Sequence, residues 1–408
     1  MLNPLEIEIV KSIQEGEIVR ILQNLIRARS DFPPGDTRAA IAIVEQELER
    51  AGIDSKRFAK DPVRQSLLAE IGEDDSGPLL LFHAHIDTVP AGDLTLWTHP
   101  PFEGILCGDA VYGRGAGDDK GSVAVQLAAF IALARSESIR RGKIMLAIVA
   151  DEESGGELGT RWLHDEGHLA ADYLVVGEQT NNRISIAERV ACGIDLTVYG
   201  KSAHGATPWE GENAVLKTCR ALSYLIEQLA PRLQDRKHPY LPAPTLNIGR
   251  IQGGIQWSIV PEKCIVEMDR RLIPGETRDK ALEEIRVILD QFSVEVESLR
   301  YNLHSEGDVA PNVDTDPDDP FVKITESALA DLVDENRPLI GYTQTSDGRW
   351  FADDGIPIIH FGPGDPALAH AADEHVPVQQ LVEGAQLMAL LGLRWHDLVS
   401  QLEDSQLT

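Results

Sequence analysis

Cysteine is scarce in this sequence, and its four copies stand far apart, at Cys107, Cys192, Cys219 and Cys264. No pair has the C-x-x-C spacing that zinc ribbons and redox motifs use, and so few cysteines do not make the framework of a disulfide-rich secreted protein. Neither a zinc ribbon nor a disulfide scaffold is therefore indicated. We expect all four cysteines to be reduced and to pack in the core.

Long apolar runs are absent as well. No segment approaches the roughly 20 consecutive apolar residues of a membrane-spanning helix, and residues 1–20 lack the unbroken apolar core of a signal peptide. Basic residues are in deficit, because 37 Lys and Arg stand against 66 Asp and Glu, which gives a formal net charge of −29. Such a balance argues against nucleic acid or an anionic membrane as a partner. We expect a cytoplasmic protein.

The patterns that are present divide the chain in two. Its 408 residues are about right for two or three domains and show no internal repeat or low-complexity tract. Segments 1–190 and 305–408 alternate strand-like apolar runs with helical periodicity, as α/β domains do. Residues 191–304 instead read strand, helix, strand, strand, helix, strand, with the last strand expected at Val294–Tyr301, which predicts a small inserted α+β sandwich. The acidic stretch Ser305–Pro320 contains Pro and Gly and is typical of a hinge.

One apolar run leads directly into chemically active side chains. Leu79–Phe82 continues into His83, His85 and Asp87 without a turn former, as a buried parallel strand does when it delivers polar groups at its carboxyl end. Because side chains in a strand alternate, the two histidines and the aspartate share one face. A histidine with a carboxylate two residues later is a plausible metal ligand with an orienting partner, although the pair alone also fits an ordinary polar strand end. We expect His85 to be the ligand and His83 to be structural.

Acidic residues and a further histidine follow apolar strands or glycine-rich turns elsewhere. The glycine-rich turn before the expected helix Ser122–Ala134 does not have P-loop spacing, and its aspartates would repel phosphate, so a metal ion fits it better. Acids crowded at a strand end are costly unless water or a cation neutralises them. The residues in such positions are Asp118, Glu152, Glu153, Glu178 and His370.

These residues can converge with His85 and Asp87, because ligands of α/β sheets bind at the carboxyl ends of the strands. Together they supply five oxygen or imidazole donors and a spare carboxylate, which is the set that two zinc ions and a base require. Each zinc needs two or three protein ligands and an open position, and a carboxylate between two ions gives the two-metal arrangement used in hydrolysis. The residues therefore predict a two-zinc site, and the same ligands accept Co²⁺ or Mn²⁺.

Eight motifs run in order from residue 83 to residue 377: HAHIDTVP, YGRGAGDDKG, DEESGG, VVGEQT, GKSAHGATPWEGENA, DRRLIPGE, TSDGRWF and AHAADEHVP. In these motifs the sequence resembles the co-catalytic zinc amidohydrolases and metallopeptidases that include acetylornithine deacetylase, succinyl-diaminopimelate desuccinylase, aminoacylase and glutamate carboxypeptidase. The match is specific to the family and not to a substrate. It implies a zinc-peptidase-like α/β catalytic domain with a mainly parallel central sheet, made from 1–190 and 305–408. A smaller ferredoxin-like α+β dimerisation and lid domain, 191–304, would interrupt it.

For the catalytic domain the resemblance implies five metal ligands, a base and an orienting group. One zinc would be held by His85 and Glu178 and the other by Glu153 and His370, with Asp118 bridging both. Asp87 would orient His85, and Glu152 would act as general base on the water shared by the ions. In the family the peptide bond after the bridging aspartate is non-proline cis, which would be Asp118–Asp119 in this chain.

For the inserted domain the resemblance implies that His204 reaches the active site of the partner subunit in a homodimer and stabilises the oxyanion. Arg271 would grip a substrate carboxylate, for which a planar bidentate guanidinium is well suited. Thr345 would contact the substrate in the same pocket, and Ser258, which stands where many relatives carry asparagine, would lie in the acyl pocket. Arg270 should face the other way from Arg271 along the strand, toward solvent or an interface.

The expected function is hydrolysis of the amide bond in an N-acyl amino acid by a zinc-activated water, with Glu152 as general base. A dipeptidase or carboxypeptidase is the nearest alternative, and an aminohydrolase is a more distant one. A binding protein without catalysis would lack Glu152 or a metal ligand, and none is missing. The implied partners are a small N-acyl amino acid or dipeptide substrate and a second copy of the chain, through residues 191–304.

Overall fold

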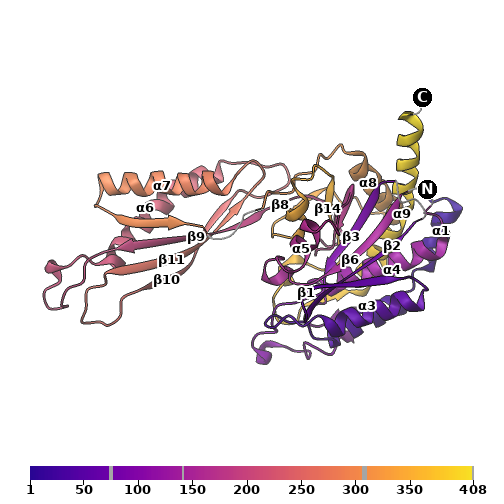
Figure 1. Cartoon of the computed structure of the whole chain (residues 1–408), viewed down its shortest axis with the longest axis horizontal. Helices are drawn as coiled ribbons and strands as arrows, with labels where there is room; N and C mark the ends of the chain where they lie inside the picture. The colour runs from indigo at the N-terminus through magenta and orange to yellow at the C-terminus, as the bar shows by residue number, and fades with distance from the viewer. Residues whose placement is uncertain (73–76, 140–141, 306–309, 407–408) are drawn as a thin grey trace. The chain divides into compact units, whose positions relative to one another are not determined.

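The computed structural model forms two compact units (Figure 1). It describes residues 1–72, 77–139, 142–305 and 310–406. Unit 1 contains Met1–Ile186, Asp314–Ile340 and Ser346–Thr408, and unit 2 contains Ala187–Val313 and Gly341–Thr345. Residues 306–309 of the expected hinge lie outside the described residues. Unit 2 therefore combines the inserted segment with a short piece of the C-terminal third, and that piece carries Thr345.

Unit 1 is built on an eight-stranded mixed sheet with the strand order β1-β2-β6-β3-β7-β14-β8-β13. In that order the strands are β1 (Ser55–Asp61), β2 (Arg64–Ile71), β6 (Lys143–Val149), β3 (Leu79–His85), β7 (Tyr173–Val176), β14 (Ile358–His360), β8 (Ser185–Glu188) and β13 (Ile340–Tyr342). The run β6-β3-β7-β14 is parallel, whereas β1, β2 and β8 pair antiparallel. The α/β sheet expected from the sequence is thus confirmed, with its parallel strands at the centre and antiparallel strands toward the edges. A small separate sheet has the order β15-β5-β4, with β15 (His375–Pro377), β5 (Ala110–Tyr112) and β4 (Ile105–Cys107).

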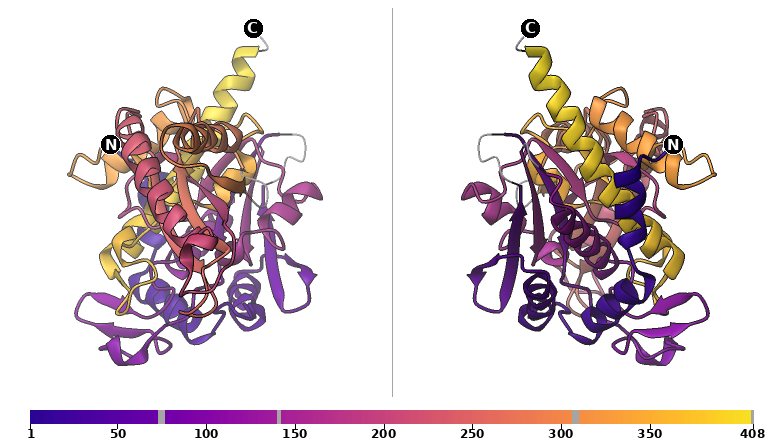
Figure 2. Two further views of the ribbon diagram at one scale, coloured as in Figure 1. Left: turned by 90° about the vertical axis from the view of Figure 1, so that its left-hand side faces the viewer. Right: turned by 90° about the vertical axis from the view of Figure 1, so that its right-hand side faces the viewer.

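Helices pack on this sheet and on one another. They are α1 (Pro4–Ser12), α2 (Glu15–Arg27), α3 (Arg38–Arg50), α4 (Lys120–Ser136), α5 (Thr160–Asp165), α8 (Pro320–Leu332) and α9 (Val378–Gln406). Helix α4 is apolar on all sides, as a fully buried helix is, and it packs against β3, β6 and α9. Helix α1 lies beside α9 (Figure 2), where Glu6 accepts a 2.9 Å hydrogen bond from Arg394. Within the described parts of the chain, none of the helices has the length and apolarity needed to span a bilayer.

Unit 2 is an antiparallel sheet with the order β10-β11-β9-β12, covered by α6 and α7. The elements are β9 (Val190–Tyr199), α6 (Ala214–Gln234), β10 (Thr245–Gly253), β11 (Lys263–Leu272), α7 (Arg278–Glu295) and β12 (Arg300–His304). The side chains of β9 that face the core alternate with more exposed ones, at Cys192, Ile194, Leu196 and Val198. These residues share one apolar cluster with Leu225 of α6 and Ile285 of α7, so both helices cover the same face of the sheet (Figure 1). The expected α+β sandwich is confirmed.

Three details of the sequence analysis are wrong. Arg270 is buried, because its guanidinium pairs with Glu276 at 2.7 Å and so needs neither solvent nor an interface. The segment Val294–Tyr301 is not one strand, since α7 continues to Glu295 and β12 begins only at Arg300. Of the four cysteines, which are all free thiols, two are exposed rather than in the core, namely Cys107 and Cys219.

Candidate metal centre

Three neighbouring parallel strands deliver polar side chains to one edge of the unit 1 sheet. Strand β3 ends at His85, β6 is followed within a few residues by Glu152 and Glu153, and β7 is followed by Glu178. The strands are adjacent in the order β6-β3-β7. Because the carboxyl ends of parallel strands meet at one edge, four side chains from distant parts of the sequence arrive together.

Two further side chains reach this edge from loops. Asp118 precedes α4, and the peptide bond Asp118–Asp119 is cis, as the family resemblance implied. His370 follows the short helix Pro366–Leu368 and adopts a left-handed backbone conformation, with φ of 62°. A residue other than glycine enters this region only where its surroundings hold it there. The backbone at His370 is thus held by the contacts around it.

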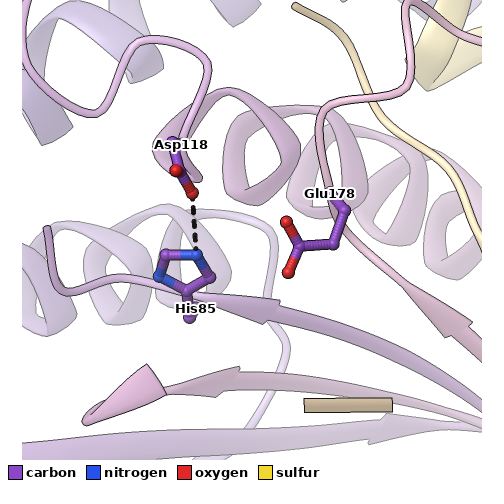
Figure 3. A group of neighbouring side chains, drawn as sticks. All are labelled: His85, Asp118 and Glu178. Carbon is purple, nitrogen blue, oxygen red and sulfur yellow. Dashed lines mark hydrogen bonds and ion pairs between the residues drawn. The ribbon is translucent and has the colours of Figure 1, made fainter. Parts of the chain in front are cut away.

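These five segments bring five side chains into two groups that share Asp118. The first group is His85, Asp118 and Glu178, which are all buried, and the second is Asp118, Glu153 and His370; within each group the donor atoms lie within 4.8 Å of one another. The Oδ1 atom of Asp118 lies 3.1 Å from Nε2 of His85, and its Oδ2 atom lies 3.4 Å from Nε2 of His370. Figure 3 shows the carboxylate of Glu178 directed toward the other two side chains of the first group. One carboxylate therefore presents an oxygen to each group.

The electrostatics of the two groups reflect an excess of buried acid. Burial raises the pKa of Glu178 well above its ordinary value, and burial likewise raises the pKa of Glu153, each with nearby carboxylates adding to the effect. Burial would also raise the pKa of Asp118, but hydrogen bonds from His370 and His85 outweigh it and hold that pKa below its usual range. Hydrogen bonds with Asp118 and Glu153 raise the pKa of His370 to about 10.

These donors fit divalent cations. Two imidazoles cannot neutralise this many buried carboxylates, and buried charge is stable only when it is paired or bound to a metal ion. Imidazole nitrogen and carboxylate oxygen together suit zinc, and they also accept manganese and cobalt. The donor set, its burial and the shared Asp118 are thus those of a centre able to hold two metal ions.

Glu152 lies beside these groups without belonging to either of them. Its backbone N–H donates to Oδ1 of Asp87 at 3.2 Å, and the N–H of Glu153 donates to Oδ2 of the same carboxylate at 3.1 Å. The Nδ1 atom of His85 lies 3.1 Å from the backbone carbonyl of Asp87 but 3.7 Å from its carboxylate. The Asp87 side chain therefore holds the turn after β6, while its carbonyl is the nearer partner of the histidine.

The side chain of Glu152 faces a cation that the sequence analysis did not single out. Its Oε1 atom lies 3.8 Å from Nη1 of Arg349, which also donates from Nη2 to the carbonyl of Gly155 at 3.0 Å. Arg349 lies inside the motif TSDGRWF, and this motif was the signal by which the sequence could have identified it.

His83 lies outside both groups. Its Nε2 atom lies 2.9 Å from Oγ1 of Thr160, and burial lowers the pKa of His83 to about 4.

Four of the expected site residues lie in unit 2, and two of them, His204 and Ser258, lie on neighbouring loops. An isolated β-bridge joins His204 to Ile259, and the N–H of Gly205 donates to the carbonyl of Ser258 at 2.7 Å. The His204 side chain is exposed, and its Nδ1 atom accepts a 3.0 Å hydrogen bond from the N–H of Ala206. Its Nε2 atom is thereby left as the nitrogen able to carry a proton for donation.

The other two expected residues of unit 2 form a second pair. Nη1 of Arg271 lies 3.3 Å from Oγ1 of Thr345, and Nε of Arg271 binds Asp269 at 3.0 Å. The Thr345 hydroxyl accepts from the N–H of Ala191 and donates to the carbonyl of Arg189, both at 2.9 Å. This threonine is thus fixed by the backbone, and it lies against an arginine that keeps part of its donor set available.

Comparison with known proteins agrees with this centre. Residues 81–394 match the model of peptidase family M20/M25/M40. A succinyl-diaminopimelate desuccinylase of Marinobacter nauticus is 31% identical over 373 residues, covering 89% of this chain and 94% of the relative. The enzyme of the same name from Methylobacterium radiotolerans is 32% identical over 378 residues, covering 89% of this chain and 93% of the relative.

Solved structures share the fold. A tripeptidase of Staphylococcus aureus superposes with a TM-score of 0.75 at 22% identity, covering 93% of this chain and 98% of the other. A Bacillus subtilis protein described as a dinuclear metal-binding peptidase superposes with a TM-score of 0.69 at 15% identity, covering 94% and 99%. The family match spans most of the sequence and includes all five residues of the two groups. This chain therefore belongs to peptidase family M20/M25/M40.

Proposed function

We propose that this protein hydrolyses the amide bond of an N-acyl amino acid and holds two zinc ions for that reaction. His85 and Glu178 would bind one ion, Glu153 and His370 the other, and Asp118 both. The observation that carries the proposal is the shared Asp118, which turns one oxygen toward each histidine, at 3.1 and 3.4 Å. Cobalt or manganese would fit the same ligands.

When bound, the two ions would act as Lewis acids and lower the pKa of water. Glu152 would accept a proton from the attacking water and later deliver it to the departing nitrogen, as a general base and then a general acid. Asp87 would keep Glu152 in place through the turn that carries it. His204 would donate a hydrogen bond to the carbonyl oxygen as negative charge develops on it.

The proposed substrate carries a free carboxylate. Arg271 would bind this group, because a guanidinium presents two parallel N–H donors to a carboxylate, and Thr345 would support that contact. Ser258 would line the acyl pocket. The names of the two relatives favour a succinyl group on the amine, and an acetyl group is the next candidate. The cytoplasmic location expected from the sequence stays a prediction.

A homodimer formed through residues 191–304 is part of the proposal. Strand β10 lies at the edge of its sheet, and edge strands offer backbone groups for pairing with another chain. Exposed apolar side chains lie on β10 and α6, at Ile251, Leu216 and Ile226. These features support unit 2 as the surface that meets a second copy.

The test of this function is an amide-hydrolysis screen of the zinc-loaded protein. The substrates would be N-succinyl, N-acetyl and N-formyl amino acids beside dipeptides, with a chelated sample as control. We expect metal-dependent release of amine from one acyl series. Cleavage of dipeptides alone would move the protein to the peptidases of the family, and no hydrolysis with two zinc ions bound would contradict the proposal.

His204→Ala is expected to lower kcat by about 10²- to 10³-fold, the effect of removing one oxyanion donor. The chain should still fold and dimerise, because the side chain is exposed and accepts only a local hydrogen bond from Ala206. His238→Ala is the matched control, since His238 lies in the same unit and accepts a similar bond from the N–H of Tyr240 at 3.3 Å. Kinetics and the mass in solution are measured for both variants. Equal rates for the two would remove the proposed role of His204.

A further inference from the structure

Glu374 is a buried carboxylate that belongs to neither metal group but contacts the turn that carries Asp118. Glu374 has no exposed surface. Its Oε1 atom accepts hydrogen bonds from the N–H of Gly117 at 2.9 Å and of Asp118 at 3.0 Å. Its Oε2 atom accepts from the N–H of Gly115 at 3.2 Å and from Nη1 of Arg114. One side chain thus satisfies three backbone donors of the turn that presents the shared aspartate.

The arginine of this pair reaches the other metal-binding loop. Nη2 of Arg114 donates to the carbonyl of His370 at 3.1 Å, and its guanidinium lies over the ring of Trp97 at 5.3 Å. The N–H of Gly113 donates to the carbonyl of Glu374 at 2.9 Å. Arg114 and Glu374 are 260 positions apart in the sequence. Their ion pair therefore joins the turn of Asp118 to the turn of His370.

Neither turn is itself part of a helix or strand, although β5 and β15 pair beside them. Buried backbone N–H groups must find acceptors, and in the Asp118 turn three of them use Glu374. His370 is held in the left-handed region, at φ of 62°, which an ordinary residue leaves unless other contacts hold it. The bond from Arg114 to its carbonyl is such a contact. This ion pair therefore links the two ligand-bearing turns, in addition to the pairing of β15 with β5 beside them.

We propose that Glu374, together with Arg114, is a positioning residue that sets the separation of Asp118 and His370 and thereby the affinity of the second metal group. This inference rests on the two-metal function proposed above. Groups that hold metal ligands in place change metal affinity by about 10- to 100-fold when they are replaced. Glutamine at position 374 keeps the shape of the side chain but offers one acceptor oxygen in place of two. Its NH₂ group would face N–H donors that now bind the carboxylate, and donors cannot bind one another.

The test is a titration of the metal-free full chain with Co²⁺, followed by the visible absorption of the bound ion. We expect two bound ions in the unaltered protein. In Glu374→Gln we expect the affinity for at least one ion to fall by about 10- to 100-fold, together with an altered spectrum, because the ligand geometry changes. Glu383→Gln is the matched control: Glu383 is a largely buried partner of Arg337 and Asn182 and touches neither metal group. Its titration and spectrum should equal those of the unaltered protein.

A second variant keeps the test decisive if Glu374→Gln does not fold. Arg114→Lys retains the positive charge beside Glu374 but cannot bind the carboxylate and the His370 carbonyl together, because it lacks the planar fork of the guanidinium. This variant should lose affinity for one of the two Co²⁺ ions more than for the other. Unaltered affinities and spectra in either folded variant would overturn the proposal. If the unaltered protein binds no Co²⁺, the two-metal function itself is wrong and this inference falls with it.

Discussion

Glutamine in place of Glu152 is expected to lower kcat by about 10²- to 10⁴-fold, the usual worth of a general base, while both metal ions stay bound. Glu152 belongs to neither ligand group, so its amide would remove no metal contact. Its backbone N–H would still donate to Asp87, which keeps the turn in place. In the metal-free chain burial raises the pKa of the Glu152 carboxyl well above its ordinary value, and two bound cations beside it would favour the ionised form that a base needs. Glutamine has the same size and cannot take up a proton.

The control for this variant is Glu157→Gln. It makes the same chemical change a few residues away, where Glu157 is exposed and forms only a 3.6 Å surface pair with Arg161. Metal content, the melting temperature and the pH profile of kcat/KM are compared for the two. A base must be ionised to act, so the activity of the unaltered protein should fall as the pH drops through the pKa of Glu152. That acid limb should disappear from the residual activity of Glu152→Gln, and full activity in this variant would mean that another group is the base.

The residues at the strand ends could be predicted because their signal is local. An apolar run that stops at a polar residue marks both a strand and the place where it delivers a side chain. His85, Glu153 and Glu178 follow such runs, and the parallel centre of the sheet brings them together. Asp118 and His370 lie in loops, where no periodicity applies, and the glycine-rich turns beside them, together with the family motifs, connected them to the other three.

The supporting residues carried no comparable signal. Glu374 stands four positions after His370, but its meaning depends on Arg114, and nothing local in the sequence says that these two meet. Arg349 stood inside a motif without an assigned role, although it is the cation nearest to Glu152 among the ion pairs of the described residues. Contacts between loops arise only in the folded chain. For this reason the ligands were easier to predict than the groups that hold them.

The errors in unit 2 have a related cause. Alternation along β11 places Arg270 and Arg271 on opposite faces, and the charge of Arg270 was expected to face solvent or an interface. The turn after the strand supplies Glu276, however, and an internal partner lets the arginine be buried. Val294 favours strand by its β-branched side chain, yet it is 87% exposed at the end of α7, where the helix and not a sheet fixes the backbone. Tertiary context decided both positions.

Asp118→Asn is expected to reduce the number of bound metal ions from two to at most one and to bring hydrolysis below detection. Both oxygens of the carboxylate face a histidine, at 3.1 and 3.4 Å. An amide has a single oxygen, and its NH₂ group is a donor that cannot ligate a cation. The metal-free variant should melt below the metal-free parent, because hydrogen bonds from His85 and His370 hold the pKa of Asp118 below its usual range and its carboxylate therefore stabilises the fold. Asp353→Asn, at an exposed position, is the control for the change of charge.

Metal binding to the unaltered protein should release protons and strengthen as the pH rises. Burial raises the pKa of Glu178 and of Glu153, so these carboxyls tend to hold a proton that a cation must displace. His370, whose pKa hydrogen bonds with Asp118 and Glu153 raise to about 10, is protonated below that pH and ligates only after losing its proton. Lowering the pH therefore weakens binding through each of the three groups. Calorimetry in two buffers of different ionisation enthalpy counts the protons released.

The same titration separates the shared ligand from an ordinary one. In Asp118→Asn the remaining ion should bind with fewer protons released, because one of the two groups no longer takes up a metal. The rise in melting temperature that saturating metal gives should shrink accordingly, since bound ligand stabilises the folded state in proportion to the logarithm of its excess over Kd. Two ions bound with parental proton release in this variant would mean that Asp118 does not bridge, and the two groups would then be separate sites.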